Sequence, residues 1–327
     1  MRALVWHGGR KLSVEGVPAP EARDGEVVFE VGLAGICGSD LHPYRGDAGP
    51  RKPPLVLGHE AVGTVAGRAG RFAVFPLVAC GTCAACRRGE ENLCERRGLL
   101  GLDRQGVFAE QVAVRADALV PLPDELDDRL AVLVEPLATC VSALGREEVG
   151  PGSTVLVVGG GPIGLLAAYV AADRGARVLV AEPLAERRAI AKRLGAADTV
   201  AGVEEAPPGA ADVAVDAVGL EPTWKGAVAG VRAGGAVVVL GLAQAEGTMP
   251  VGDLVRRGIT VRGHYAYSRA DFEAALRLLG ERPPPVGWLD VLALDQGAEG
   301  FRRLVEEPAR ATKILLQVGP RRSGGGR

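Results

Sequence analysis

The sequence has little of what proteins use to bind nucleic acids or acidic membranes. Only 4% of its 327 residues are aromatic, and its formal net charge is −2. Binding to nucleic acid or to an anionic membrane depends on a basic surface, and single strands are also held by stacking on aromatic side chains. The composition therefore predicts neither a nucleic-acid partner nor a membrane partner.

A secretory signal and a long unbroken hydrophobic segment are also missing. The residues after Met1 run directly into an alternating pattern typical of a strand. The most apolar stretch, 154–172, is interrupted by three glycines and a proline, so a strand, a turn and a helix explain it better than a membrane span. We therefore expect a cytoplasmic protein.

Asparagine is the scarcest of the polar residues, occurring only at Asn92, and lysine is rare beside arginine. Low asparagine, glutamine and methionine are typical of proteins from thermophiles. A GC-rich genome would give the same excess of arginine, alanine and glycine, so both origins stay open. The length predicts two domains, each able to bury its own core.

Four of the six cysteines are crowded into one short stretch, Cys80, Cys83, Cys86 and Cys94. Four thiolates at this spacing can enclose one tetrahedral zinc ion, which would contribute roughly 10–16 kcal/mol to holding the segment. Disulfides are uncommon in a cytosolic chain. An iron–sulfur cluster also uses closely spaced cysteines, but there a proline follows the last one, whereas Glu95 follows Cys94. We predict a structural zinc site.

A second group of metal-ligand residues begins with Cys37 and continues with His59 and Glu60. A catalytic zinc takes three protein ligands of these types and keeps one position open. A further candidate is Glu135, which interrupts the apolar run 130–137, where a carboxylate is costly unless it is paired or bound to a metal. Glu135 as a helix-cap or surface residue is the alternative. Whether Glu60 or Glu135 completes the shell stays open.

A dinucleotide-binding motif starts at residue 159. A buried-strand pattern, 154–158, is followed by G-x-G-x-x-G and then by an apolar helical pattern. In this context the glycines allow the backbone to approach a pyrophosphate, which rests on the helix N-terminus. The candidate contacts are Gly159, Gly161, Pro162 and Gly164, the proline being suited to the first helical turn.

The second strand of this region, 176–180, leads to Glu182. An acidic residue at this position bonds the adenosine ribose hydroxyls and would repel a 2′-phosphate, so it favours NAD over NADP. Arg187 and Arg188 lie close by in the sequence and argue for the reverse. We expect NAD as the cofactor, with NADP as the alternative.

Repeated strand–helix units follow, with strands at 212–216, 236–240 and 259–261. Such units build a doubly wound parallel sheet that binds ligands at the C-terminal ends of its strands, which makes Gly241 and Leu242 candidate nicotinamide contacts. The first 70 residues instead show short strands separated by glycine and proline, typical of an antiparallel, barrel-like domain.

Taken together, the chain resembles the zinc-dependent medium-chain dehydrogenase/reductase family over nearly its whole length. The motifs that carry the resemblance stand in family order: the segment around Cys37, Gly58-His59-Glu60, the four-cysteine segment, Glu135-Pro136-Leu137 and the glycine motif. The Gly-His-Glu and Glu-Pro-Leu motifs are most similar to the branch of polyol, butanediol, secondary-alcohol and threonine dehydrogenases.

The resemblance implies an α/β protein with a Rossmann-type parallel sheet and a mostly antiparallel, GroES-like catalytic domain. We expect the catalytic domain over 1–145 and the dinucleotide-binding domain over 146–266. Residues 267–320, with helices near 270–279 and 298–307 and a strand at 313–318, would return to the catalytic domain. Residues 321–327 would form a disordered tail.

The resemblance also implies roles for individual residues. Cys37 and His59 would bind zinc, Glu60 would be a ligand that exchanges with water, and Glu135 would be a ligand or act on the bound water. Ser39 and His42 match the family's proton relay. Its cofactor contacts correspond to Ile163, Glu182, Arg187, Leu240, Gly241, Leu242 and His264.

The implied activity is hydride transfer from a secondary alcohol or polyol to NAD, with one catalytic and one structural zinc, in a homodimer or homotetramer. An aldose or L-threonine is the alternative substrate, although no Trp-bearing loop follows Tyr44 as in threonine dehydrogenases. A metal-free quinone reductase and a non-enzymatic NAD-binding protein are the remaining alternatives. One departure from the family is Gly70-Arg71-Phe72, where Gly-Asp is customary.

Overall fold

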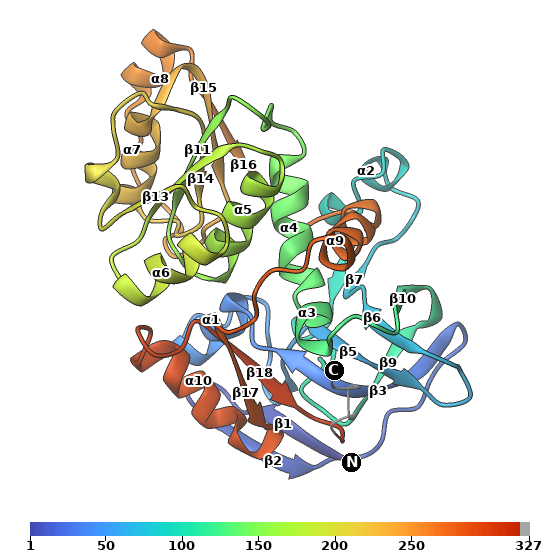
Figure 1. The fold of residues 1–327 in the computed structure, drawn as a ribbon. Coiled ribbons are helices and arrows are strands. Elements are labelled where there is room, and N and C mark those ends of the chain that lie inside the picture. Colours follow the sequence, from blue (N-terminus) through green and yellow to red (C-terminus); the bar gives the residue numbers. More distant parts are fainter. Residues whose placement is uncertain (321–327) are drawn as a thin grey trace. The chain divides into compact units, whose positions relative to one another are not determined.

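The computed structural model describes residues 1–320, which divide into two compact units, Met1–Glu135 with the residues from Ser268 onward (unit 1) and Pro136–Tyr267 (unit 2) (Figure 1). The first boundary lies within helix α4 (Val134–Leu144), earlier than the expected position at 145. A continuous helix passes from one unit into the next, so no linker marks the boundary. The expected tail, 321–327, lies outside the described residues.

The sheet at the centre of unit 1 is built around strand β3 (Glu26–Gly35). The expected C-terminal strand is present as β18 (Lys313–Gln317) and pairs antiparallel with β3, so this part of the chain returns to the first unit. Beside it lies β17 (Leu289–Ala293), which the sequence did not predict. The other strands of this sheet are β5 (Glu60–Val65), β6 (Arg71–Val74), β9 (Gln111–Arg115) and β10 (Leu119–Leu122).

Two smaller sheets complete the strands of unit 1. One contains β1 (Arg2–Trp6), β2 (Leu12–Gly16) and β4 (Leu55–Val56), and the other contains β7 (Leu77–Val78) and β8 (Gly98–Leu99). Ahead of β9, the N–H groups of Val107 and Phe108 donate to the carbonyls of Gly58 and Leu57 at 3.1 Å. This contact supports the backbone immediately before His59.

Register in the central sheet gathers polar residues at one end of β3. Gly35 lies opposite Glu60 of β5 on one side and opposite Leu315 of β18 on the other. Side chains two residues apart on a strand share a face. Lys313 therefore projects on the same face as Leu315, next to the end of β3.

The segment after Cys37, for which the sequence predicted no helix, forms helix α1 (Gly38–Arg45). Asp40 at its third position accepts a hydrogen bond from the Cys37 N–H at 3.0 Å, a local N-terminal cap that favours the helix. The helix ends where Gly46 adopts a φ of 108°. Prolines and glycines around this short helix masked it in the sequence.

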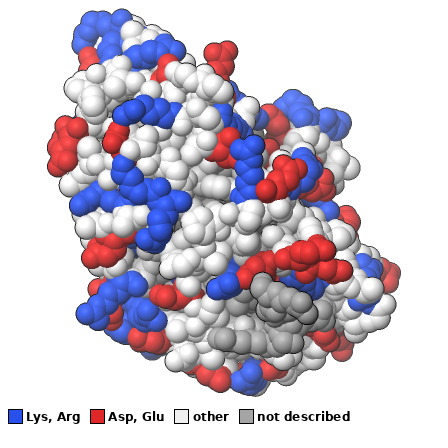
Figure 2. Space-filling model, viewed as in Figure 1, with Lys and Arg blue, Asp and Glu red and all other residues white. Residues whose placement is uncertain are grey.

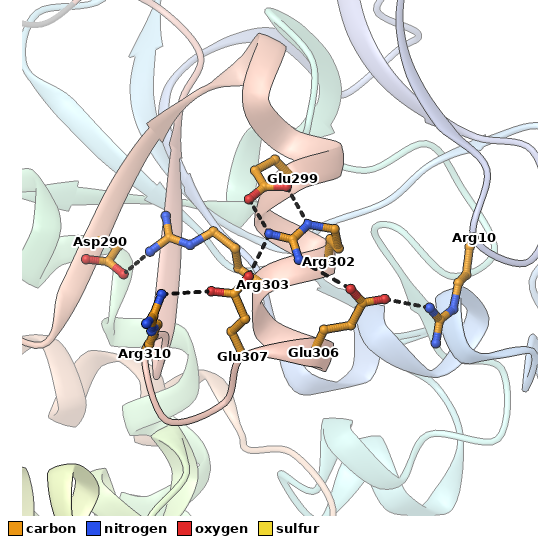
Figure 3. Close-up of polar contacts among 8 residues, drawn as sticks. All are labelled: Arg10, Asp290, Glu299, Arg302, Arg303, Glu306, Glu307 and Arg310. Atoms are coloured by element: carbon orange, nitrogen blue, oxygen red, sulfur yellow. Dashed lines mark hydrogen bonds and ion pairs between the residues drawn. The ribbon is translucent and has the colours of Figure 1, made fainter.

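The other helices of unit 1 are α2 (Ala84–Arg87), α3 (Asp128–Val132), α9 (Arg269–Glu281) and α10 (Gly297–Glu306). Helix α10 buries Phe301 completely, with its ring 5.5 Å from that of Tyr44 on α1. On its other side α10 carries Arg302, which pairs with three glutamates, one of which also pairs with Arg10 (Figure 3). These exposed pairs are screened by solvent, so burial of Phe301 is the larger contribution to holding α1.

The sequence departure at Arg71 has a structural explanation. The Arg71 guanidinium pairs with Asp128 at the start of α3 and donates to the carbonyls of Pro123, Asp124 and Leu126. It therefore joins β6 to the segment that leads into α3. The departure from the family at Gly70-Arg71-Phe72 therefore affects the connection between β6 and the segment before α3.

Unit 2 contains one six-stranded parallel sheet in the order β13-β12-β11-β14-β15-β16, which confirms the doubly wound fold. The order reverses on either side of β11, so right-handed crossovers place the helices on both faces. The strands are β11 (Thr154–Val158), β12 (Arg177–Ala181), β13 (Asp198–Val200), β14 (Ala211–Asp216), β15 (Val231–Val239) and β16 (Thr260–Gly263). The further helices are α5 (Pro162–Asp173), α6 (Ala185–Arg193), α7 (Glu221–Gly230) and α8 (Val251–Arg257).

Surface properties agree with the composition. On the face shown in Figure 2, acidic and basic side chains are intermingled. Over the described residues 1–320, no helix has both the length and the hydrophobicity needed to cross a membrane.

Candidate active site

The four cysteines of the 80–94 segment come together as predicted. The sulfur atoms of these four residues all lie within 4.8 Å of one another, and none forms a disulfide: Cys80, Cys83, Cys86 and Cys94. Cys83 lies at the N-terminus of α2, and Cys94 is fully buried. A closed set of four sulfur ligands fits a tetrahedral zinc ion.

The structure also brings together Cys37, His59 and Glu60, whose ligand atoms all lie within 4.8 Å of one another. Cys37 is the residue before α1, His59 precedes β5, and Glu60 is the first residue of that strand. The imidazole is 3% exposed and the carboxylate 0%. A thiolate, an imidazole and a carboxylate are the donor types of a catalytic zinc site.

The charges around His59 favour a cation. Its Nδ1 lies 3.8 Å from Oδ1 of Asp40, and within the described residues this nitrogen has no hydrogen-bond partner. Burial lowers the pKa of His59, but the nearby Asp40, Cys37 and Glu135 outweigh this effect and raise the pKa well above its usual value. A pocket that stabilises positive charge and contains an unsatisfied imidazole nitrogen fits a bound metal ion.

Sequence reasoning missed Asp40, although it lies between the two predicted relay residues. Its side chain is fully buried and accepts hydrogen bonds from the Cys37 N–H at 3.0 Å and the Gly58 N–H at 3.3 Å. Asp40 thereby joins the backbone of Cys37 to the backbone that precedes His59. Its place at the start of α1 was hidden because that helix was not predicted.

The second residue that was missed is Lys313. Its Nζ donates to both oxygens of Glu60, at 2.6 and 2.5 Å, and to the carbonyl of Ile36 at 2.9 Å. Burial lowers the pKa of Lys313, but Glu60, Cys37 and Glu135 together raise it above its usual value, so the ammonium group is charged. A lysine in the apolar strand Lys313–Gln317 was the sequence signal that could have identified it.

Glu60 is therefore both a candidate ligand and one half of a buried ion pair. The carboxylate is seated against Gly35, where an added Cβ would lie 2.0 Å from Oε2. Only glycine at position 35 leaves room for this arrangement. The exchange of Glu60 with water stays a prediction, and Lys313 is the group that would compete with the metal for its oxygens.

Glu135 lies in the first turn of α4 and is 8% exposed. It is not one of the three residues whose ligand atoms converge, but its charge raises the pKa values of both His59 and Lys313. It is therefore close enough to act on the site electrostatically. Its role as a ligand or in acting on bound water stays a prediction.

The predicted relay residues Ser39 and His42 both lie on α1. Residues three apart in a helix share a side, so both side chains project from the same side of α1. The His42 side chain is 35% exposed, with Nδ1 3.9 Å from Oδ2 of Asp47. Both side chains are partly exposed, so a proton could pass from this part of α1 to solvent.

The glycine motif forms a tight turn at the end of β11. Gly159 has a φ of 97°, and a Cβ at Gly164 would lie 1.8 Å from the carbonyl oxygen of Gly159. Gly161 is the N-cap of α5, and Pro162 is its first residue, followed by Ile163. The turn thus presents a helix N-terminus at the C-terminal edge of the sheet, as a pyrophosphate requires.

Glu182 lies beside this turn and is 4% exposed. It accepts hydrogen bonds from the N–H of Gly160 at 2.6 Å and of Leu184 at 2.9 Å. Arg188 donates to the backbone carbonyls of Glu182 and Pro183. Burial lowers the pKa of Arg187, the charge of Glu182 raises it in part, and its Nε has no partner within residues 1–320. The contact of Arg187 with a cofactor stays a prediction.

The other predicted cofactor contacts lie at the C-terminal ends of β15 and β16. Leu240, Gly241 and Leu242 follow β15, and Leu242 is 70% exposed. The ring of His264 is within hydrogen-bond distance of Arg262 Nη1 at Nδ1 (3.1 Å) and of the Ala266 carbonyl at Nε2 (2.8 Å). The His264 ring is thus held by its own segment, and its contact with a cofactor stays a prediction.

Comparison with known proteins identifies the family. The alcohol dehydrogenase GroES-like domain matches residues 23–124, and the zinc-binding dehydrogenase domain matches residues 162–281. Sorbitol dehydrogenase of Bacillus subtilis is 34% identical, over 97% of each chain. The chain belongs to the zinc-dependent medium-chain dehydrogenase family.

Solved structures agree with this assignment. Alcohol dehydrogenase TADH from Thermus sp. ATN1 is 32% identical, covers 98% of this chain and 100% of its own, and has a TM-score of 0.89. A zinc-binding dehydrogenase from Sinorhizobium meliloti bound to NADP is 30% identical, with a TM-score of 0.85 and coverage of 97% and 98%. This dehydrogenase is therefore an oxidoreductase that uses zinc and a nicotinamide dinucleotide.

The buried ion pair gives the first prediction. Lys313→Met leaves the Glu60 carboxylate buried without its cation, so we expect the dehydrogenase to lose about 3–5 kcal/mol of unfolding free energy, measured by denaturant titration. The matched control is Lys225→Met, which removes a lysine from an exposed pair with Glu221 and should change stability far less. Equal effects of the two substitutions would show that the Lys313 pair does not hold this site together.

Proposed function

We propose that this dehydrogenase oxidises a secondary alcohol or a polyol with NAD as hydride acceptor. The observation that supports it most directly is the buried convergence of Cys37, His59 and Glu60. These donors would hold a zinc ion that acts as a Lewis acid on the substrate hydroxyl and lowers its pKa. The sorbitol dehydrogenase relative supports a polyol.

The residues of this chain would hold the metal and move the proton. Cys37 and His59 are the fixed ligands, and Glu60 or Glu135 supplies the carboxylate. Ser39 would accept the proton of the substrate hydroxyl and release its own, which would pass through the cofactor ribose to His42, on the same side of α1, and then to solvent. A bound nicotinamide dinucleotide would supply the hydride acceptor for the substrate carbon.

NAD rather than NADP is the proposed cofactor, because Glu182 is buried and fixed by two backbone N–H groups next to the glycine turn. A 2′-phosphate beside this carboxylate would be repelled. NADP is the alternative cofactor, because the similar dehydrogenase from Sinorhizobium meliloti has NADP bound. Arg187 is the residue of this chain that would contact it.

The alternatives have less support. A metal-free quinone reductase has no need of a buried Cys37, His59 and Glu60 set. A non-enzymatic NAD-binding protein would likewise not need it. L-threonine is disfavoured by the missing Trp-bearing loop after Tyr44. None of the six cysteines forms a disulfide, which supports a reducing, cytoplasmic location.

An activity panel tests the substrate and the cofactor together. We expect NAD to be reduced with secondary alcohols or sugar alcohols, and a zinc chelator to abolish the reaction. Glu182→Ala should raise kcat/KM for NADP relative to NAD by about tenfold, whereas Glu186→Ala, an exposed neighbour on α6, should not. Turnover that survives the chelator would contradict the zinc chemistry, and turnover with only aldoses or L-threonine would contradict the substrate class.

The proton relay makes a separate prediction. His42→Ala should slow alcohol oxidation roughly 100-fold and flatten its rise with pH, while zinc content stays unchanged, because the imidazole moves a proton and binds no metal. His7→Ala is the matched control, since His7 is exposed and pairs with Glu15 away from the site. Loss of zinc from the His42 variant would show that His42 is a ligand, and an unchanged pH profile would contradict the relay.

We further propose that two copies associate through the edge of the parallel sheet. Strand β16 lies at the end of the strand order, so its outer backbone groups are not paired within the described sheet. Helix α8 presents Val251 and Val255 at 62% and 76% exposure, one turn apart. Antiparallel pairing of two β16 strands would form a two-fold interface that also covers these valines.

Light scattering tests this association. Val255→Asp should convert the oligomer to a smaller species, because a carboxylate would be buried at the interface. Leu93→Asp, an exposed apolar residue of unit 1, should leave the mass unchanged. A monomeric wild-type protein, or an unchanged Val255 variant, would contradict the proposed interface.

A further inference from the structure

Asp216, the last residue of β14, is a fully buried carboxylate that the proposed chemistry does not use. It lies beside the end of β11, which carries the glycine turn, and beside the end of β15. Two segments leave the sheet here: 217–220 after β14 and 240–244 after β15. Both are at the edge where a parallel sheet of this kind binds its ligand.

A single residue holds both segments. The carboxylate of Asp216 accepts hydrogen bonds from the N–H groups of Val218 (3.1 Å) and Gly219 (3.0 Å). Its main-chain carbonyl accepts from the N–H groups of Leu240 (2.8 Å) and Gly241 (3.0 Å). Asp216 thus satisfies four backbone donors, two from each segment.

The two segments are also interlocked. A Cβ at Gly219 would lie 2.2 Å from the carbonyl carbon of Gly241, and a Cβ at Gly241 would lie 2.1 Å from the Gly219 nitrogen. The Gln244 N–H donates to the Gly219 carbonyl at 2.9 Å, and its side-chain oxygen accepts from the Glu221 N–H at 3.1 Å. Backbone in such close contact moves as one body, so a shift of one segment displaces the other.

A buried carboxylate is an expensive way to satisfy two N–H groups. Burial raises the pKa of Asp216 above its usual value, while the hydrogen bonds from Val218 and Gly219 lower it in part. The Gly219 N–H donates to both carboxylate oxygens, at 3.2 and 3.0 Å, and asparagine would replace the second oxygen with an amide nitrogen that faces this N–H group. The carboxylate is therefore matched to holding two donors in one fixed position.

We infer that Asp216 is a positioning residue for the nicotinamide end of the cofactor. Its hydrogen bonds set the placement of Leu240, Gly241 and Leu242 through the Gly219–Gly241 contact. The inference rests on the proposed function, in which those three residues contact the nicotinamide half of NAD. The adenosine half is served by Glu182 and the glycine turn. The Asp216 carboxylate accepts no hydrogen bond from either, although Val218 lies against Gly159 of that turn.

The same strand offers a matched control. Asp212, near the opposite end of β14, accepts hydrogen bonds from the Thr154 N–H at 2.8 Å and from Arg232 Nε at 2.7 Å. It is also an aspartate that accepts from backbone, but it lies toward the N-terminal edge of the sheet. Asp212→Asn therefore reports on loss of a β14 carboxylate without disturbing the segments after Asp216.

The experiment measures the dissociation constants of NADH and of ADP-ribose, which lacks the nicotinamide ring, by titration calorimetry. Asp216→Asn should weaken NADH binding about tenfold and ADP-ribose binding less than about twofold, the loss expected for one hydrogen bond to a charged group. Asp212→Asn should change neither. Circular dichroism confirms that each variant is folded.

Other outcomes overturn the inference in distinguishable ways. Equal weakening of NADH and ADP-ribose by Asp216→Asn would indicate general damage to unit 2, and no weakening would remove the positioning role. If wild type binds neither ligand, the proposed function fails and this inference with it.

A second variant covers the case in which Asp216→Asn does not fold. Gln244→Ala removes the side-chain bond to Glu221 from a partly exposed position, so it loosens the same segments without a buried change. It should weaken NADH more than ADP-ribose, by a smaller factor than Asp216→Asn. Equal effects on both ligands would again contradict the inference.

Discussion

The structure of unit 1 depends on a buried ion pair between Lys313 and Glu60. The two residues are far apart in sequence, and they meet because β3 pairs with β5 on one side and with β18 on the other. Removing either charge alone would leave the other buried and unpaired. The candidate ligand Glu60 is therefore energetically linked to the pairing of β18 with β3, which returns the C-terminal segment to unit 1. Gly35 supplies the space for the carboxylate. The ion pair that holds the candidate zinc ligand Glu60 therefore also stabilises the sheet.

Unit 2 uses buried carboxylates differently. Glu182 and Asp216 accept hydrogen bonds from backbone N–H groups of the segments that follow the strands. In unit 1 the Glu60 carboxylate is paired with the Lys313 ammonium group and is also a candidate ligand for a metal ion. In unit 2 the carboxylates fix backbone geometry at the edge of the sheet. The first arrangement suits a site that binds charge, and the second suits a surface that must match a large ligand.

The sequence alone was enough to predict the site residues that follow one another at characteristic spacings along the chain. Cys37, His59 and Glu60 lie within a short segment, and the four cysteines and the glycine motif carry characteristic spacings, so their grouping could be predicted without knowing the fold. Lys313 and Asp40 could not be found this way, because their roles depend on strand register and on a helix that Pro43 and Gly46 obscured. Strand β17 was missed because it depends on pairing with β18.

The central claim is that Cys37, His59 and a carboxylate hold a zinc ion distinct from the one held by the four cysteines. The most direct test is the zinc content of purified wild-type, Cys37→Ser and Cys94→Ser proteins, determined by atomic emission together with alcohol oxidation activity. The account predicts two zinc ions per wild-type chain, and a folded Cys37 variant that keeps one ion and has no activity. A Cys37 variant that retains both ions, or an active wild-type protein with a single zinc, would contradict it.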